Sequence, residues 1–454
     1  MPPLPSGCRQ TCWIDRYGAG WDDGGGGAWC RASVKPTYSE DLHATRRPPP
    51  CRHLCDHPAC AFEARSRHGL APLIPQPVQH SNRTLATNEA ISDSTTPAVV
   101  YCEGHFSGLD GKTAHGLVRS CGGYSIRAVI DSQCAGLDAG FVLDGIVNGI
   151  PIVADLAAAM ALLGGSKATL IYGMAPASGL FSDEDRHMLL TAMAAGLNLV
   201  SGMREFLGEE AAFQAAAKHH GVTIRDVRRP SALKDLKLFS GSISRVRCAR
   251  IAVLGTDGAI GKRTTATLLV QALRAHGIRA VLVSTGQTGL IQGGRFGVPL
   301  DAIPSQFGSG EVEAAVVAAY EAEHPQVIVI EGQGALSHPA YLSSSFILRG
   351  SQPQAVILQH APARRCLSDF PFAPIPTPAS EIRLIESFAP TRVIGLTINH
   401  EGMNEAQLTA AIALYEAELS IPVTDAISRP AANLVAMVVR AFPELSGVRQ
   451  PLGL

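Results

Sequence analysis

The amino-acid sequence predicts an α/β protein with two doubly wound parallel sheets. Short apolar runs of strand length alternate with segments of helical spacing from residue 97 onward. Aromatic residues make up only 6% of the chain whereas 45 residues are glycine, which favours glycine-rich turns over an aromatic-rich β-sandwich. In the second half, a glycine-rich loop that ends in lysine lies between a predicted strand and a predicted helix, which is the setting of a phosphate-binding loop.

The first α/β domain is predicted over residues 97–240. Its helices are expected at 183–195, where Ser182 suits an N-cap before three acidic residues, and at 209–220. Its strands are apolar runs bounded by Gly or Asp, at 98–101, 126–130, 168–172, 198–201 and 222–226. Strands that alternate with helices in this way imply a parallel sheet.

The second α/β domain is predicted over residues 245–454, after a boundary at Pro230 to Ser244. Its strands are expected at 250–254, 280–284, 327–330, 355–359, 393–398 and 422–423. Its helices are expected at 262–275, 310–322, 380–388, 404–417 and 431–441. The pattern again predicts a parallel sheet with helices on both faces.

Residues 1–96 differ from the rest of the chain. All three tryptophans lie in the first thirty residues, and proline-rich stretches show no helical or strand periodicity. We predict a disordered extension and linker, or a translation start placed too far upstream. Possible metal ligands gather here, namely Cys51, His53, Cys55, His57 and Cys60. Their spacing is irregular and no second ligand pair follows, so we predict no metal site.

Composition and charge exclude several classes of protein. The chain has 38 Lys+Arg against 39 Asp+Glu, whereas a dedicated nucleic-acid binder usually has a strong basic excess. No apolar run approaches the roughly 18 residues that span a bilayer, and no basic segment followed by an apolar one opens the chain. We therefore expect a cytoplasmic protein that acts on small molecules, without nucleic-acid or membrane partners. A homo-oligomer is a separate expectation, because the sequence does not show the oligomeric state.

The loop before the helix at 262–275 predicts phosphate binding and a P-loop NTPase fold. It reads GTDGAIGKRTT over residues 255–265. Glycines let backbone N–H groups turn inward, the helix N-terminus adds partial positive charge, and Lys262 adds a full one. The predicted phosphate-binding residues are Gly255, Thr256, Gly258, Gly261, Lys262, Arg263, Thr264 and Thr265. Arg263 stands where Ser or Thr normally holds Mg²⁺, so phosphate binding is better supported than Mg²⁺-dependent hydrolysis.

Polar residues at other strand ends extend the candidate site. Glu331 ends an apolar strand, where P-loop folds place an acid that faces the phosphates; a capping role or a pair with Lys262 is the alternative. His338 is a candidate proton acceptor or an exposed loop residue. Other residues have a ligand-binding role and a plain structural role as alternatives, namely Lys112 in a GLDGKT motif, Gln287, Thr288, Asn399 as a reader of a purine edge, and Arg349, Arg364 and Arg365 as carboxylate binders.

The quoted motifs resemble known proteins. The loop at 255–262, the EGQG at 331–334 and Asn399 are similar to dethiobiotin synthetase and its P-loop relatives. A closer resemblance is to a bacterial D-glutamate N-acetyltransferase-like family that pairs a Rossmann-like N-terminal domain with a P-loop domain. It covers about residues 97–450 and is carried by DGKT at 110–113, YGMAP at 172–176, the loop at 255–265, GQTG at 286–289 and residues 331–339.

The resemblance implies an N-acetyltransferase of D-amino-acid catabolism, which moves acetyl from acetyl-CoA to the amine of D-glutamate or a similar D-amino acid. The P-loop would hold the coenzyme pyrophosphate without hydrolysis. This reaction needs a base and an oxyanion donor. Our candidates are Glu331 or Asp257 as base with His338 behind them, Gln333 or N–H groups near Gly332 to Gly334 for the oxyanion, and Arg263 or Arg349 as a carboxylate clamp. The alternatives are an ATP- and Mg²⁺-dependent ligase or kinase of the dethiobiotin type, and a non-catalytic nucleotide-binding module.

Overall fold

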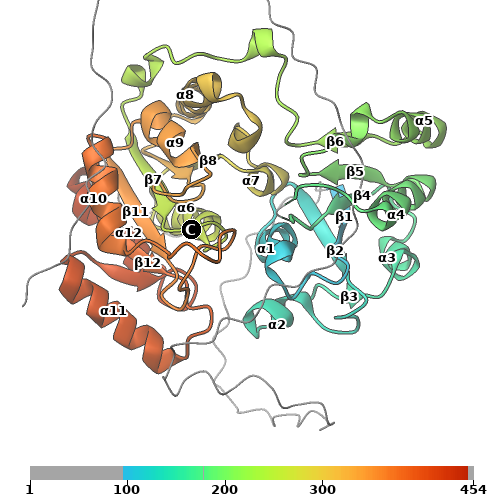
Figure 1. Ribbon diagram of the computed structural model, residues 1–454, viewed down its shortest axis with the longest axis horizontal. Helices are drawn as coiled ribbons and strands as arrows, with labels where there is room; N and C mark the ends of the chain where they lie inside the picture. The colour runs from blue at the N-terminus through green and yellow to red at the C-terminus, as the bar shows by residue number, and fades with distance from the viewer. Residues whose placement is uncertain (1–95, 177, 448–454) are drawn as a thin grey trace, which may run out of the picture. The chain divides into compact units, whose positions relative to one another are not determined.

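Two parallel sheets organise the computed structural model, which describes residues 96–176 and 178–447 (Figure 1). These residues belong to one contact-defined unit that spans residues 84–454. The predictions for residues 1–95, including the possible metal ligands Cys51 to Cys60, lie outside the described part. In that part, no helix is long and apolar enough to cross a membrane.

The first sheet has the strand order of a Rossmann fold. Its strands are β1 (Thr96–Tyr101), β2 (Tyr124–Ile130), β3 (Ile152–Val153), β4 (Thr169–Tyr172), β5 (Asn198–Ser201) and β6 (Ile224–Asp226). They lie in the order β3-β2-β1-β4-β5-β6, and every neighbouring pair is parallel. The helices are α1 (Lys112–Arg119), α2 (Ala139–Asp144), α3 (Leu156–Leu163), α4 (Asp183–Ala194) and α5 (Ala211–His220). The predicted doubly wound parallel sheet is confirmed.

The second sheet is also entirely parallel. Its strands are β7 (Ala249–Gly255), β8 (Ala280–Ser284), β9 (Phe296–Gly297), β10 (Val327–Glu331), β11 (Ala355–His360), β12 (Arg392–Ile398) and β13 (Val423–Asp425). They lie in the order β13-β12-β11-β7-β10-β8-β9. The helices are α6 (Lys262–Ala275), α7 (Gln287–Ile291), α8 (Ser305–Glu323), α9 (Ser343–Ser351), α10 (Pro378–Phe388), α11 (Glu405–Leu419) and α12 (Ala432–Ala441).

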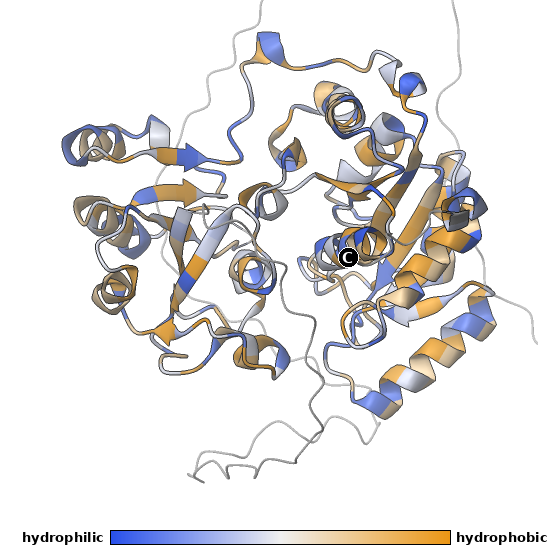
Figure 2. Ribbon diagram, turned by 180° about the vertical axis from the view of Figure 1, so that it is seen from behind, coloured by the Kyte–Doolittle hydropathy of each residue, from blue (hydrophilic) through white to orange (hydrophobic). Residues whose placement is uncertain are grey.

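Both faces of the second sheet are covered by helices. Ile251 and Val253 of β7 pack in one core with residues of α6 and α12, whereas Ala252 and Leu254 pack in the other with residues of α8 and α9. Figure 2 shows hydrophobic residues along the central strands of this sheet. Because a parallel strand buried on both faces offers only its ends to a ligand, function is expected at the carboxyl ends of these strands.

Local signals explain where several helices begin. Ser182 caps α4 with a complete capping box, in which its side chain accepts from Asp185 N and the Asp185 side chain accepts from Ser182 N. The prediction of α8 was wrong at its start, because the helix begins at Ser305 and runs through two glycines. Those glycines allow close packing, since an added Cβ would lie 2.6 Å from Phe346 at Gly308 and 2.2 Å from the Lys237 carbonyl at Gly310.

Candidate functional site

The phosphate loop lies between β7 and α6, as the sequence predicts. Gly261, immediately before α6, has φ of +97°, a left-handed backbone that favours glycine. Gly255, at the end of β7, is surrounded closely, since an added Cβ would lie 2.9 Å from the Lys262 side chain and 3.0 Å from the Gln359 carbonyl. The glycines thus allow a tight curl directly before the helix N-terminus.

Lys262 is buried inside this loop. Lys262 is the first residue of α6 and is 5% exposed. Its ammonium donates to the carbonyl of Asp257 across the loop. Burial lowers the pKa of Lys262 to about 8, against the opposing effect of the nearby Asp257 carboxylate. An ammonium held here by a single protein carbonyl keeps N–H groups available for an anionic ligand.

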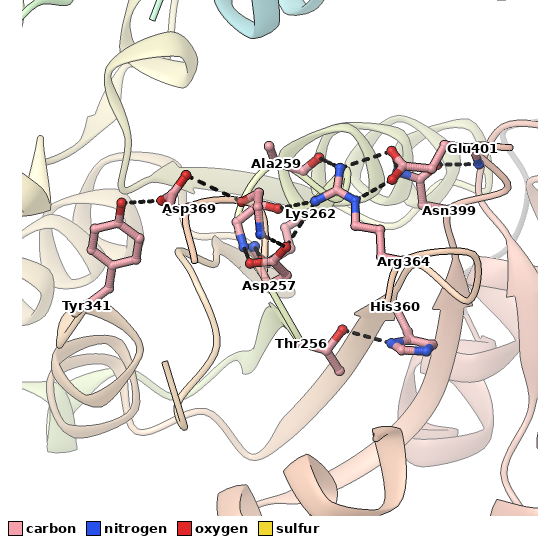
Figure 3. Close-up of polar contacts among 12 residues, drawn as sticks. Thr256, Asp257, Ala259, Lys262, Tyr341, His360, Arg364, Asp369, Asn399 and Glu401 are labelled. Atoms are coloured by element: carbon pink, nitrogen blue, oxygen red, sulfur yellow. Dashed lines mark hydrogen bonds and ion pairs between the residues drawn. The ribbon is translucent and has the colours of Figure 1, made fainter. Parts of the chain in front are cut away.

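Arg364 fixes the shape of the loop from outside (Figure 3). Its Nη1 donates to Asp257 Oδ2 and to the Gly258 carbonyl, both at 3.0 Å, and its Nη2 donates to the Ala259 carbonyl at 3.0 Å. Glu401 holds the guanidinium in turn, accepting from Nη2 at 3.0 Å and also from Nε. Arg364 was a candidate carboxylate binder, but its donors are used by the loop and by Glu401.

Asp257 is an anchor of the loop. Its side chain is fully buried, Oδ1 accepts from Gly258 N at 2.6 Å, and Oδ2 accepts from Arg364 and from Ser368 N at 2.9 Å. Both oxygens are therefore engaged by protein donors. Of the two predicted bases, this geometry favours Glu331.

Glu331 ends β10, next to the phosphate-loop strand β7. It is 4% exposed, and its Oε2 accepts from Thr285 N at 3.1 Å. Burial raises the pKa of Glu331, while the Arg263 charge and the N–H groups of Thr285 and Gly286 oppose the shift. A buried carboxyl with a raised pKa beside a phosphate loop is a typical proton acceptor of an enzyme site.

Arg263 reaches from α6 to the first half of the chain. Its Nη2 lies 3.5 Å from the Lys112 carbonyl, and an added Cβ on Gly116 of α1 would lie 2.2 Å from the same nitrogen. Thr288 Oγ1 and Thr113 Oγ1 share a hydrogen bond of 3.0 Å nearby. These three contacting segments, at 112–116, 263 and 288, form what we call the junction, and they place a cation close to Glu331.

Two predicted phosphate-binding hydroxyls are engaged by the second sheet. Thr256 Oγ1 bonds to His360 Nδ1 at 2.8 Å, and Thr265 Oγ1 donates to Gln359 Oε1 at 2.6 Å. Both threonines are buried, so they anchor the loop ends to β11. Thr264, between Arg263 and Thr265, is only partly buried, and its hydroxyl has no bond to another described residue.

The two glutamines and Thr288 lie around Glu331. Gln333 Nε2 donates to Thr285 Oγ1 at 3.2 Å, next to the N–H that Glu331 accepts. Gln287 is buried against Gly202 of the first half, where an added Cβ would lie 2.7 Å from its Cγ. The predicted substrate residues Gln287, Thr288 and Gln333 are thus brought together at the start of α7 and the end of β10.

His338 is a buried donor rather than the exposed residue that its loop position allowed. Its Nδ1 accepts from Ala340 N at 3.2 Å, so the neutral ring carries its proton on Nε2. That nitrogen is buried and has no partner among the described residues. The ring stacks on Tyr341 at 4.3 Å, and burial lowers the pKa of His338. A neutral N–H donor suits an oxyanion or phosphate oxygen better than it suits proton abstraction.

The remaining predicted residues lie in different places. Asn399 supports the Arg364 clamp, because its Oδ1 accepts from Glu401 N at 3.1 Å and its Nδ2 donates to Glu401 Oε2 at 3.2 Å. Lys112 begins α1 at the junction. Arg349 lies in the last turn of α9 with its guanidinium 4.9 Å above Phe388, so the structure does not bring it to the site.

The sequence reasoning missed two arginines, Arg204 and Arg228. They follow the carboxyl ends of β5 and β6, the same kind of position that identified Glu331. The strands that precede them are predicted at 198–201 and 222–226. The rule that ligands bind at the carboxyl ends of parallel strands could therefore have identified both arginines. Among the described residues, no group of three or more His, Cys, Asp or Glu side chains could hold a metal ion.

Comparisons with known proteins agree with this architecture. The Rossmann-like domain of the DUF1611 family matches residues 132–230, and its P-loop domain matches residues 237–435. The crystal structure of a DUF1611 family protein from Anabaena variabilis is 32% identical, covers 76% of this chain and 100% of that chain, and has a TM-score of 0.70. This chain belongs to the DUF1611 family.

Two curated relatives of this DUF1611 protein carry the name D-glutamate N-acetyltransferase. The relative from Tritonibacter scottomollicae is 31% identical and the one from a Pseudoalteromonas species is 27% identical, each over 274 residues. These alignments span 59% of this chain and 80% of each relative. The predicted family and fold are confirmed, including the Rossmann-like and P-loop domains.

Proposed function

We propose that this DUF1611 protein is an acyltransferase that moves acetyl from acetyl-CoA to the amine of D-glutamate or a similar D-amino acid. One observation carries the proposal: a fixed cation, Arg263, replaces the hydroxyl that normally holds Mg²⁺, and it lies close to the buried carboxyl of Glu331 beside the phosphate loop. The names of the two relatives support the reaction and the substrate class.

The phosphate loop would bind the coenzyme. Lys262, the N-terminus of α6 and the loop N–H groups offer positive charge to its pyrophosphate. Arg263 adds a second fixed positive charge next to the loop. Because it stands where a Mg²⁺-binding hydroxyl normally lies, the loop would bind the anionic coenzyme without hydrolysing a nucleotide. The coenzyme supplies an activated thioester carbonyl when it is bound.

Glu331 would accept the proton that makes the substrate ammonium a nucleophile. The free amine then forms a C–N bond with the acetyl carbon and the C–S bond breaks. The nitrogen loses a second proton, which passes to the sulfur, so that the coenzyme leaves as a thiol. The raised pKa of Glu331 favours proton uptake, because burial weakens its carboxylate form. His338 Nε2–H and the Gln333 amide are the donors in this region for the carbonyl oxygen as it gains negative charge.

A product assay tests the reaction. The purified full chain is incubated with D-glutamate and either acetyl-CoA or MgATP, while free thiol and ADP are followed separately. Thiol release that depends on D-glutamate supports acetyl transfer. ADP release would instead support a ligase or kinase, in which Thr264 holds the metal, and absence of both products would contradict an enzyme of either class.

Lys262→Ala tests whether the loop holds the coenzyme. We expect the KM for acetyl-CoA to rise at least tenfold, because a buried charged contact of about 1.5–3 kcal/mol is lost. Lys234→Ala is the matched control, since Lys234 is exposed before the second sheet. An unchanged KM in Lys262→Ala would remove the loop from the coenzyme site.

A further inference from the structure

Three cations follow strand ends of the first sheet. Lys112 begins α1 after the loop that follows β1, while Arg204 and Arg228 come two to three residues after β5 and β6. Because all strands of this sheet are parallel, these residues share its carboxyl edge. Neither arginine has a role in the coenzyme chemistry described above.

Arg228 is tied to the surroundings of Glu331 by a short series of contacts. Its Nη2 pairs with Asp301 Oδ2 at 2.7 Å. Leu300, the neighbour of Asp301, donates its N–H to the Thr285 carbonyl at 3.0 Å. Thr285 N in turn donates to Glu331 at 3.1 Å. Arg228 is thus linked, through Asp301 and its neighbour Leu300, to the Thr285 segment that donates to Glu331, and its buried Nε has no partner among the described residues.

Arg204 is anchored by its stem and keeps an exposed guanidinium. Its N–H donates to the Gly179 carbonyl at 3.1 Å, and an added Cβ on Gly179 would lie 2.8 Å from its Cγ and Cδ. Gly202, two residues earlier, contacts Gln287 at the start of α7. Within residues 96–176 and 178–447, no acidic side chain forms an ion pair with Arg204, so its charge is available to a ligand.

Lys112 joins these arginines through the junction. Its carbonyl lies 3.5 Å from Arg263, and its neighbour Thr113 bonds to Thr288. Burial lowers the pKa of Lys112, the Asp369 charge opposes this shift, and the Arg228 charge adds to it. Burial also lowers the pKa of Arg228, with Asp301 opposing the shift and Arg204 adding to it. The three cations therefore lie within electrostatic range of one another, in surroundings that also contain the carboxylates of Asp369 and Asp301.

We propose that Arg204 and Arg228, with Lys112, bind the two carboxylates of the dicarboxylic amino acid whose amine Glu331 deprotonates. The proposal rests on the proposed function and extends it to substrate recognition. A guanidinium can hold a carboxylate through two parallel hydrogen bonds, so two arginines match a substrate with two carboxylates. An amino acid with an uncharged side chain would leave one buried donor unpaired and would be a poor substrate.

The test compares substrates in Arg204→Gln and Arg228→Gln at saturating acetyl-CoA. We expect kcat/KM for D-glutamate to fall by about 10- to 100-fold in each variant, as for the loss of a charged hydrogen bond. The preference for D-glutamate over D-glutamine should shrink in at least one of them. Arg204→Lys should recover part of the activity because it restores the charge, and the KM for acetyl-CoA should change less than twofold.

Arg229→Gln is the matched control, because Arg229 neighbours Arg228 but is 55% exposed and pairs with Glu209. Thermal unfolding identifies a variant that fails to fold, and exposed Arg204 then carries the test. A raised acetyl-CoA KM with unchanged D-glutamate kinetics would assign the cluster to coenzyme phosphate and overturn the proposal. If the wild-type protein acetylates no amino acid, the proposed function fails; calorimetric binding of D-glutamate that Arg204→Gln does not weaken would then contradict this inference separately.

Discussion

At Glu331, burial disfavours the ionised carboxylate that the proposed proton transfer requires. Its carboxyl lies at a strand end, is 4% exposed, and accepts from a backbone N–H of the α7 approach. Gly289 keeps this space open, since an added Cβ would lie 2.8 Å from Glu331 Oε2. The raised pKa means that the ionised carboxylate destabilises the folded protein at neutral pH.

Glu331→Gln should therefore lower the activity and raise the stability of the folded protein. We expect kcat to fall by about 100-fold or more, as for loss of a general base. The free energy of unfolding at pH 7 should rise, because the amide removes a buried charge. The gain should vanish as the pH falls below the raised pKa, where Glu331 is protonated. Thermal unfolding at pH 4 and pH 7 measures this, and a lower unfolding temperature at pH 7 would contradict it.

The pKa of Lys262 predicts how coenzyme binding depends on pH. Since that pKa is about 8, the ammonium is charged at pH 7 and loses its proton as the pH rises through 8. If only the charged form binds phosphate, the dissociation constant for CoA should rise about tenfold between pH 7 and pH 9. Titration calorimetry should also detect proton uptake on binding near pH 9. Lys262→Ala should bind weakly at both pH values, without this dependence.

Individual site residues could be predicted only where a positional rule applies. The rule for phosphate loops found Lys262, and the rule for strand ends found Glu331, because both depend on local order along the chain. The direction of Arg349 depends on how α9 packs against α10, which no local pattern specifies. The hydroxyls of Thr256 and Thr265 likewise bond to β11, a strand about a hundred residues later.

At the scale of elements, the phosphate loop depends on a segment far along the sequence. Arg364 follows β11, and it receives its orientation from Glu401 after β12. The guanidinium gathers one carboxylate and two carbonyls of the loop, so the loop shape is fixed before a ligand arrives. Preorganisation of this kind raises affinity because less order must be created on binding.

Arg364→Lys should weaken coenzyme binding more than it slows chemistry. A lysine keeps the charge but cannot donate in the planar fork that serves Asp257, Gly258 and Ala259 together. We expect the KM for acetyl-CoA to rise about tenfold, for the loss of one charged hydrogen bond, with a smaller change in kcat. Glu401→Gln should have a milder effect of the same kind. Arg365→Lys is the control, since that neighbour is exposed; equal KM values for Arg364→Lys and the control would contradict the clamp.

Strands were easier to predict than short helices. The long central strands are apolar runs buried on both faces, so their pattern follows from burial alone. The sequence prediction missed the two-residue strands β3 and β9 and the short helices α1, α2, α3, α7 and α9. Of these helices, α1, α7 and α9 contain glycines at positions 116, 289 and 350. Glycine is needed at these positions because neighbouring atoms lie close, such as Arg263 at Gly116 and the Ser309 carbonyl at Gly350. In the sequence alone, however, a glycine indicates a turn.

At the scale of the whole described chain, the two sheets are joined around Arg263. The guanidinium passes over Gly116 of α1, while Thr288 bonds to Thr113 beside it. Gln292 adds further contacts, since its side-chain amide donates to the Gly116 and Ser120 carbonyls. The junction therefore lies next to Glu331 and the phosphate loop, so residues of both halves lie at the candidate site.

Gly116→Ala should disturb this site without harming α1 itself. The new methyl would lie 2.2 Å from Arg263 Nη2, so the guanidinium must move. We expect kcat/KM to fall at least tenfold, while alanine adds up to about 1 kcal/mol of helix propensity. Gly122→Ala is the control, because its added Cβ would meet only the Gln292 carbonyl at 3.7 Å. Full activity in Gly116→Ala would show that the position of Arg263 is unimportant.

Ile291 couples the evolution of the two halves, because a side chain from one half packs in the core of the other. It belongs to α7, within the P-loop half, yet it is fully buried in the core of the Rossmann-like half. A volume change at Ile291 must be matched by other residues of that core, which are encoded upstream in the Rossmann-like half. Recombination that exchanges one half between relatives would separate Ile291 from the core in which it packs. We therefore expect these two domains to have diverged as a pair.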